Sequence, residues 1–410
     1  MVKGVPAPAT PTRPALAAVF TATFFVRFAF GITIAVFASY LAGHSTGLSG
    51  SDVGNAGFVS ALAPIGEFST VLFAGAAADR WGRFPVLFAG MGAAALLFVG
   101  ISTTRVVPTL GAANLAFGVA SGAILAASLA VIADRAAVDE RGYEMGRFDA
   151  MNLFGWIAGF AFGLGIEQVL PNSMLDIVFL AGAAAILLGL LAAGALVRRE
   201  IVVARARAFD FRRVVRSAVR SSVLVVTLPW LAIYSLLGTA LVFLGPAAEG
   251  VGIRPGYVAI AIGAGGALLV ISQPYFGRLA DRAGRTRMMT VGAGGFVLVL
   301  LCASLLARYG VTVPLLVGVG VGIACALAYG PAALAALADL ATEQGRATTM
   351  AIYSLTISLG MFVGLLASTA LYGRYGTTGL YPYFGAIAAV LVGLTVARWV
   401  QAARARIPVR

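Results

Sequence analysis

The stretch Gly75-Ala-Ala-Ala-Asp79-Arg80-Trp-Gly82-Arg83-Phe84 decides how this chain is built, because a related stretch returns 202 residues later. The second stretch reads Gly277-Arg-Leu-Ala-Asp281-Arg282-Ala-Gly284-Arg285-Thr286. Each copy lies between two long apolar runs, so each is predicted to be a short charged turn between two helices. The repeat therefore predicts two duplicated halves in a chain of 410 residues.

The composition is that of a protein that lies in a lipid bilayer. Hydrophobic residues make up 60% of the chain and charged residues 11%, whereas soluble domains carry about 25% charged residues. Many apolar runs reach the roughly 20 residues that a helix needs to cross a bilayer. Runs of this length favour helices over the strands of a membrane barrel, which are only about 10 residues long.

Hydropathy predicts twelve transmembrane helices in two sets of six. The first set covers residues 15–42, 53–78, 85–104, 107–133, 144–170 and 174–197. The second set covers residues 222–248, 256–279, 287–307, 311–339, 346–371 and 380–402. The predicted fold class is thus all-α, with two pseudo-symmetric six-helix bundles at residues 15–197 and 222–402. A basic linker at residues 198–221 joins them, and tails are expected at residues 1–14 and 403–410.

The positions of the basic residues predict that both termini are cytoplasmic. The chain has 29 Lys and Arg residues and a net charge of +13. Four of the 29 fall in predicted outer loops and Arg27 lies inside a helix, which leaves 24 for the cytoplasmic segments. The charge therefore indicates topology, and we expect a lipid bilayer and no nucleic acid as partner. The linker is predicted to be either an amphipathic helix on the inner membrane surface or a basic loop that fixes topology.

Glycines provide a second repeat. Gly155, Gly159 and Gly163 lie in the fifth predicted helix, and Gly360 and Gly364 lie in the eleventh. Glycines four residues apart share one face of a helix and allow a neighbouring helix to approach closely. Gly155 and Gly360 are 205 residues apart, close to the spacing of the charged turns, so the two halves are predicted to pack in the same way.

The repeated turn, G-x-x-x-D-R-x-G-R, resembles the signature between the second and third helices of the major facilitator superfamily. The resemblance extends over all twelve predicted helices. It implies a secondary transporter of a proton-coupled, drug-efflux-like branch, in which two bundles rock about a central cavity. It also implies a multi-pass protein of the cytoplasmic membrane that works as a monomer.

The resemblance further implies a cytoplasmic gate at the two turns. Asp79 would engage Arg346 at the start of the eleventh helix, Gly75 and Gly277 would permit close helix packing, and Gly82 and Gly284 would permit tight turns. The alternative is a set of loop charges that only fixes topology. The predicted gate residues are Gly75, Asp79, Arg80, Gly82, Arg83, Gly277, Asp281, Arg282, Gly284, Arg285 and Arg346.

Two opposite charges within the first half carry a sharper prediction. Arg27 lies near the centre of the first predicted helix, and Glu67 lies near the centre of the second. Antiparallel helices of one bundle place both at the same depth, where an unpaired charge is costly. We expect an ion pair beside a cavity, with Glu67 as the proton site and Arg27 as a fixed counterion or an anion-binding group. The alternative is a static pair that joins two helices.

Three further polar residues of the first half are assigned to proton coupling or to the central cavity. Asn152 is predicted to line the cavity. Asp149 is either a second proton site or part of an inner gate network with Asp134 and Glu144. Asn114 stands where drug antiporters of the family carry an arginine, and Arg27 is the hypothetical replacement for that arginine.

The candidate residues of the second half are neutral, and they suit a partly apolar substrate. They are Tyr234, Gln273, Tyr329 and Tyr353. No nucleophile with a base and no cluster of metal ligands is found in the sequence, so an enzyme is not expected. The leading functional prediction is proton-coupled export of a small organic or amphipathic compound, driven by the proton gradient without a cofactor. The alternatives are proton-linked uptake or exchange of an organic anion bound by Arg27, a lipid or lysolipid flippase, and a non-transporting membrane sensor.

Overall fold

The computed structural model describes residues 13–42, 50–135, 141–197, 221–250, 255–340 and 346–405. Within these ranges the chain forms α-helices and two short 3-10 helices, and no strand. The first half contains α1 (Arg13–Ala42), α2 (Gly50–Trp81), α3 (Arg83–Ser102), α4 (Val107–Arg135), α5 (Arg141–Glu167), η1 (Asn172–Met174) and α6 (Asp176–Val197). The second half contains α8 (Ser221–Gly250), α9 (Pro255–Ala283), α10 (Arg285–Tyr309), α11 (Val313–Ala326), α12 (Tyr329–Leu340), α13 (Arg346–Tyr375), η2 (Gly376–Gly379) and α14 (Leu380–Ala405).

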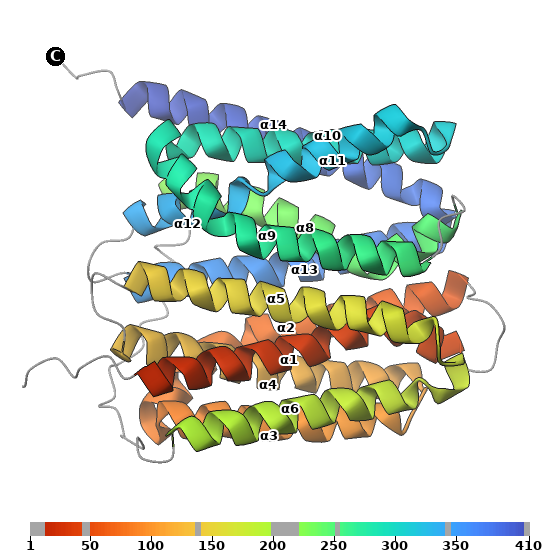
Figure 1. The fold of residues 1–410 in the computed structure, drawn as a ribbon, viewed down its shortest axis with the longest axis vertical. Helices are drawn as coiled ribbons and strands as arrows, with labels where there is room; N and C mark the ends of the chain where they lie inside the picture. The colour runs from red at the N-terminus through yellow and green to blue at the C-terminus, as the bar shows by residue number, and fades with distance from the viewer. Residues whose placement is uncertain are drawn as a thin grey trace, which may run out of the picture.

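The helices form two groups that lie side by side (Figure 1). Helices α1–α6 pack together in one half, and α8–α14 pack together in the other. The halves meet mainly where α2 contacts α13 and where α5 contacts α9. The start of α1 and the end of α14 lie on the same side of the molecule in Figure 1. That this side is cytoplasmic remains a prediction from the charges, and residues 198–220 of the predicted linker lie outside the described residues.

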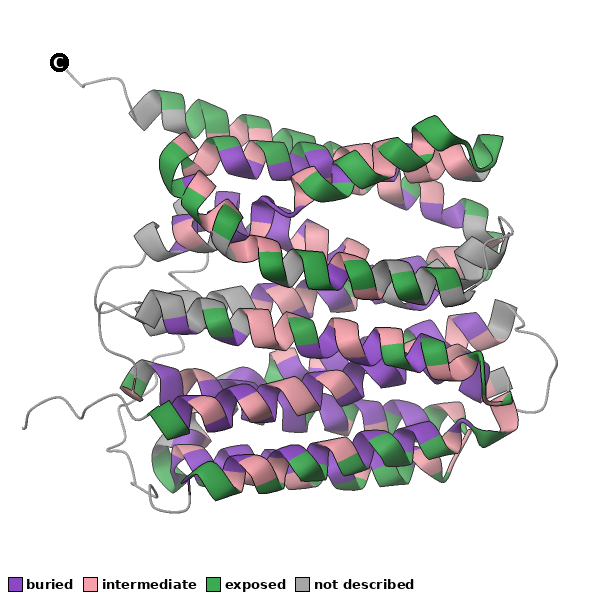
Figure 2. Cartoon of the chain, in the orientation of Figure 1, coloured by how far each residue is buried: buried purple, intermediate pink, exposed green. Residues whose placement is uncertain are grey.

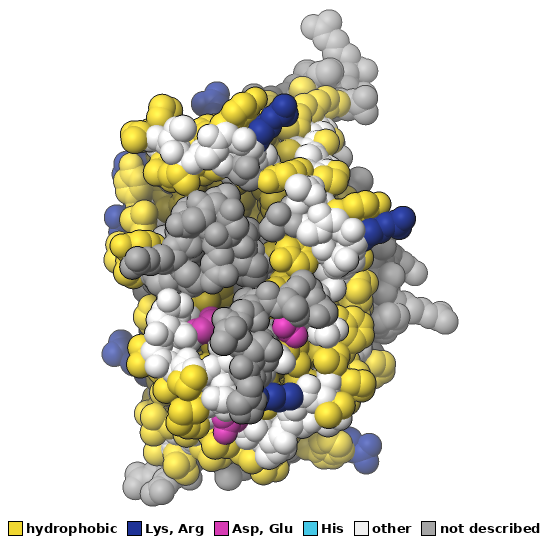
Figure 3. All heavy atoms as spheres, turned by 90° about the vertical axis from the view of Figure 1, so that its right-hand side faces the viewer, with side chains coloured by type: hydrophobic (Ala, Val, Ile, Leu, Met, Phe, Trp, Pro, Cys, Tyr) yellow, Lys and Arg dark blue, Asp and Glu magenta, His cyan; other side chains and the backbone are white. Residues whose placement is uncertain are grey.

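The outer surface is suited to a bilayer. Ten segments of the described chain are long and apolar enough to cross a membrane, and α2 and α9 are not among them. Figure 2 shows many exposed residues along α14, and Figure 3 shows hydrophobic side chains over the flanks of the molecule. The prediction of a multi-pass membrane protein is therefore supported, while twelve spans remain a prediction.

The tenth predicted span, residues 311–339, differs from a continuous helix. Helix α11 ends at Ala326, and α12 begins at Tyr329 after a turn in which the Ala328 amide donates to the Cys325 carbonyl. Pro331 supplies the physical reason, because it has no N–H to donate to the carbonyl four residues earlier. Hydropathy alone missed this break, since both parts are apolar.

The two charged turns have the same geometry. Gly82 separates α2 from α3 with φ of 99°, and Gly284 separates α9 from α10 with φ of 94°. The Gly82 amide donates to the Ala78 carbonyl at 3.1 Å, and the Gly284 amide donates to the Ala280 carbonyl at 3.1 Å. Positive φ is the region that glycine adopts at least cost, so the repeated sequence builds the predicted tight turn twice.

The glycine repeat also builds the same contact twice. A Cβ atom at Gly159 of α5 would overlap the Phe28 carbonyl of α1. A Cβ atom at Gly364 of α13 would overlap the Ser235 carbonyl of α8 in the same way. Gly155 and Gly360 repeat the relationship one turn earlier, against Phe24 and Leu231. The helix pairs α1–α5 and α8–α13 are therefore equivalent, with offsets of 207 residues along the first helix and 205 along the second.

Candidate functional site

Arg27 of α1 and Glu67 of α2 form a buried ion pair with two parallel hydrogen bonds. Nη1 of Arg27 donates to Oε2 of Glu67 at 2.8 Å, and Nη2 donates to Oε1 at 3.0 Å. Arg27 is 7% exposed and Glu67 is 6% exposed. The planar guanidinium matches the carboxylate in this geometry, which is the strong form of such a pair. The two charges that the sequence places at one depth are thus in direct contact.

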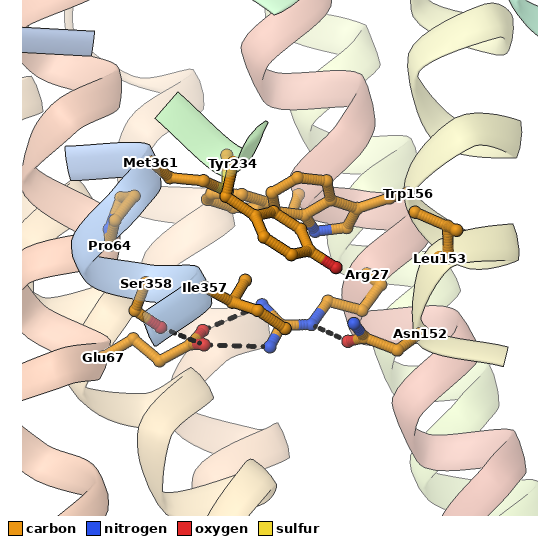
Figure 4. Close-up of a pocket in the computed structure, with 11 residues that line it drawn as sticks. Arg27, Pro64, Glu67, Asn152, Leu153, Trp156, Tyr234, Ile357, Ser358 and Met361 are labelled. Carbon is orange, nitrogen blue, oxygen red and sulfur yellow. Dashed lines mark hydrogen bonds and ion pairs between the residues drawn. The ribbon is translucent and has the colours of Figure 1, made fainter. Parts of the chain in front are cut away.

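Other side chains complete the hydrogen bonding of this pair (Figure 4). Ser121 of α4 donates to Oε2 of Glu67 at 2.7 Å, and Ser358 of α13 donates to Oε1 at 2.9 Å. Nε of Arg27 donates to Oδ1 of Asn152 in α5 at 2.6 Å. Glu67 therefore accepts four hydrogen bonds, one of which comes from the opposite half of the molecule. Buried charges need such partners to offset the loss of hydration.

The ion pair lies at the edge of a small cavity between the halves. The space available to the centre of a water molecule is about 20 Å³, which is room for about one water. Most of the lining is apolar or aromatic. The lining residues are Arg27, Phe30, Pro64, Glu67, Asn152, Leu153, Trp156, Tyr234, Ile357, Ser358 and Met361. In this arrangement the ion pair itself is buried, and the cavity beside it is too small for a substrate.

The cavity lies between equivalent surfaces of the two halves. With the offsets given by the glycine contacts, Arg27 of α1 corresponds to Tyr234 of α8, and both line the cavity. Trp156 of α5 likewise corresponds to Met361 of α13, and both line the cavity. The cavity is therefore lined by equivalent positions of both halves, but its charges come only from the first half.

Three predicted site residues lie away from this cavity. Asn114 is buried, and its Nδ2 donates to the Val59 carbonyl at 2.6 Å, so it ties α4 to α2. Tyr329 begins α12 after the helix break and lies in the core of the second half. Gln273 of α9 lies partly buried near Gly330. The side chains of Asp149 and Tyr353 lie outside the described residues.

The charged turns connect to the ends of neighbouring helices. Nε of Arg83 donates to Oδ2 of Asp134, at the end of α4, at 3.1 Å. Arg285 donates to the Ala335 carbonyl of α12 and lies 3.6 Å from the Asp281 carboxylate. Arg80 and Arg282 are exposed. The Asp79 and Arg346 side chains lie outside the described residues, so their contact remains a prediction.

One predicted role of the turn glycines is not seen. A Cβ atom at Gly75 or Gly277 would meet no atom within 4 Å among the described residues. Close helix packing is carried by other glycines, among them Gly159 and Gly364. Among the described residues, no group of three His, Cys, Asp or Glu side chains could hold a metal ion.

Ser121, Ser358 and Trp156 line or complete the site without having been predicted from the sequence. Serines inside helices usually bond to a carbonyl of their own helix, so their presence alone does not indicate a site. Trp156 follows Gly155 directly, and a large aromatic side chain in a glycine-rich stretch of helix is the signal that was available.

Comparison with known proteins supplies the family. The family model for the Major Facilitator Superfamily matches residues 19–329 and 237–409. Among solved structures, the human organic anion transporter MFSD10 (TETRAN) has a TM-score of 0.69 at 17% identity, covering 94% of this chain and 99% of its own. A peptide transporter POT in complex with sulfate has a TM-score of 0.71 at 14% identity, with 97% of each chain covered.

A third solved structure, of the nucleoside transporter NupG, has a TM-score of 0.66 at 15% identity and covers 93% of this chain and 98% of its own. At these identities the likeness concerns the fold alone. No curated sequence is similar enough to the chain to count as a match. The family match covers nearly the whole chain. It supports the prediction that the protein is a transporter and not an enzyme. The chain belongs to the major facilitator superfamily.

Proposed function

We propose that this protein is a proton-coupled secondary transporter that works by alternating access, with Glu67 as the proton site. The observation that carries the proposal is the buried Arg27–Glu67 pair beside a cavity between the halves. Family membership supports transport in general. Alternating access about a site near the midplane is the working principle of such folds.

The proposed coupling follows from the contacts of Glu67. When Glu67 takes up a proton, Arg27 stays charged and loses its buried counterion. An unpaired buried charge is costly, so the site must then admit water or an anion, or must open. The Ser358 hydroxyl would donate to a neutral group in place of a carboxylate, and such a bond is weaker by about half. Protonation would thus loosen a bond that joins the two halves.

The substrate that we propose first is a small amphipathic organic compound, exported as in the drug-efflux-like branch. The mainly apolar and aromatic lining of the cavity supports this choice over a strongly polar nutrient. The proton gradient would supply the energy without a cofactor. We further propose the cytoplasmic membrane as the location and a monomer as the working unit.

A second candidate is proton-linked uptake or exchange of an organic anion. The bidentate geometry favours it, because protonation of Glu67 releases Nη1 and Nη2 of Arg27 together. Two parallel N–H groups are the arrangement that binds a carboxylate best. The two candidates differ in the sign of the coupled proton movement. Binding of an exported compound would expel the proton, whereas binding of an anion would require proton uptake.

The sign of proton movement is the test. Purified protein in weak buffer with a pH-sensitive dye would receive chloramphenicol, a neutral amphipathic compound, or benzoate, and binding would be measured separately by equilibrium dialysis. Acidification supports export by antiport, and alkalinisation supports anion transport with a proton. Either signal should vanish in Glu67→Gln and persist in Asp176→Asn, at the start of α6. Binding without proton movement in the native protein would overturn Glu67 as the coupling site.

A further inference from the structure

One buried donor of the cavity has no partner. Nε1 of Trp156, in α5, contacts no acceptor among the described residues, and Trp156 is 7% exposed. The hydrogen bonds of Arg27 and Ser358 already go to Glu67 and Asn152. Buried donors in proteins are nearly always paired, so an unpaired one in a cavity calls for an explanation. The lack of a partner is explained if the Trp156 N–H donates its hydrogen bond to a bound ligand.

The surroundings of Trp156 indicate the shape of that ligand. Its ring lies 5.1 Å from the ring of Phe30 at an interplanar angle of 30°. Tyr234 and Met361 line the cavity from the opposite half. In Figure 4 the indole nitrogen lies on the edge of the ring that faces the other lining side chains. Trp156 and Tyr234 line the cavity from opposite halves, so a separation of the halves would open a slot between two aromatic side chains, which a flat ring would fit.

The charge of the site indicates which ligands are disfavoured. Arg27 and Glu67 neutralise each other, so the site in this arrangement carries no net charge. A cationic ligand would have to displace the Arg27 guanidinium, which already makes two bonds to Glu67. An acceptor group faces no such competition at Nε1 of Trp156.

We propose that the central site selects aromatic compounds with a hydrogen-bond acceptor on the ring edge, and that the Trp156 N–H recognises this acceptor. The inference rests on the proposed function only in taking this cavity as the substrate site. Trp156 is then a specificity-determining residue, while Arg27 and Glu67 serve the proton. The proposal concerns binding, so it is testable without any transport measurement.

The test compares quinoline with naphthalene, which have the same shape and differ in one ring nitrogen that accepts a hydrogen bond. The protein contains four tryptophans, Trp81, Trp156, Trp230 and Trp399. Labelling them with ¹⁵N gives one indole N–H signal each in nuclear magnetic resonance spectra of the protein in lipid nanodiscs. Loss of one signal in Trp156→Phe assigns the Trp156 signal. Quinoline is expected to move that signal downfield, and naphthalene is not.

Affinity provides the second measurement. Trp156→Phe keeps an aromatic ring and should lower the affinity for quinoline about three- to tenfold, with naphthalene unchanged. Trp230→Phe is the matched control, because Trp230 is buried in α8 but does not line the cavity, and it should keep the preference for quinoline. Equal responses to the two probes, or a response at another tryptophan only, would overturn the proposal. If Trp156→Phe does not fold, Trp81→Phe, Trp230→Phe and Trp399→Phe assign the other three signals and thereby that of Trp156, so the probe pair on native protein still decides. Failure of proton coupling would leave these signals unaffected.

Discussion

The Ser358 hydroxyl of α13 and the Glu67 carboxylate of α2 share a hydrogen bond of 2.9 Å that joins the two halves of the molecule. Ser121 of α4 donates to the same carboxylate at 2.7 Å from within one half. Both serines are buried and make the same kind of bond. They belong to different halves, which makes them a pair for experiments on coupling between the halves.

Ser358→Ala should shift the protein about tenfold or more away from the arrangement in which this bond joins the halves, because a hydrogen bond to a charged group contributes roughly 1.5–3 kcal/mol. Ser121→Ala should leave the arrangement unchanged. Spin labels at Val106 and Val311, both exposed and in opposite halves, would report the distance distribution by pulsed electron paramagnetic resonance. The free cysteines Cys302 and Cys325 would first be replaced. Equal shifts in the two variants would contradict a role for Ser358 in joining the halves.

Glu67→Gln should abolish transport driven by a pH gradient while sparing exchange of substrate across the membrane. Glutamine keeps the size, and its amide oxygen accepts from one serine while its NH2 group donates to the hydroxyl of the other, but it carries no titratable charge. Proteoliposomes with and without a pH gradient would measure the two activities on one preparation. Persistent gradient-driven accumulation in this variant would show that the proton is carried elsewhere.

Arg27→Ala should abolish coupled transport in a protein that still folds and inserts. Removing one partner of a buried ion pair is expected to cost about 3–5 kcal/mol, because the other charge is left unpaired. Adding Glu67→Gln to this variant should recover part of the stability and none of the transport. Tm values in detergent, read by size-exclusion chromatography after heating, would give the comparison. Additive losses of Tm in the double variant would mean that the two residues are not coupled.

Gly159→Ala should lower stability by about 1–3 kcal/mol, because the added methyl group overlaps the Phe28 carbonyl of α1. Gly165→Ala is the control, because Gly165 lies in the same helix and a Cβ atom there would meet no atom within 4 Å. It should be neutral or raise stability by up to about 1 kcal/mol through helix propensity. Thermal unfolding of the two variants under one set of conditions checks this. Similar losses in both would rule out the close helix contact as the cause.

Gly284→Ala should cost about 1–3 kcal/mol through the backbone alone, since φ of 94° with ψ of 133° is strained for residues with a Cβ. No atom lies within 4 Å of a Cβ at Gly284, whereas a Cβ at Gly82 would lie 3.3 Å from Pro85. Gly82→Ala should therefore lose at least as much stability. Heat-denaturation curves of the two variants measure both effects. An unchanged Tm in Gly284→Ala would disprove the strained turn.

The sequence allowed the charged turns and the Arg27–Glu67 contact to be predicted for a simple physical reason. Charges are rare in apolar runs, and helix length converts a sequence position into a depth in the membrane. Partners of neutral groups are harder to predict. The hydroxyls of Thr33 and Ser368 bond to carbonyls of their own helices, whereas Ser358 bonds to another half.

The remaining differences concern the rotation and continuity of helices. Asn114 lies at a suitable position along α4, but its amide faces the backbone of α2. Tyr329 was assigned to a continuous helix, and the break before it places its ring in the core of the second half. Hydropathy sums residues over a window, so it reports neither the direction of one side chain nor a two-residue turn within an apolar run.

The correspondence of Arg27 with Tyr234, and of Trp156 with Met361, has a stereochemical consequence. Two identical halves would offer a bound molecule two equivalent orientations related by the axis between them. Here a guanidinium in the first half corresponds to a phenol in the second, and an indole corresponds to a thioether, so the two orientations are inequivalent. A cargo molecule would keep one end toward the first half throughout its passage. Mirror-image forms of a chiral cargo would then meet different contacts and cross at different rates.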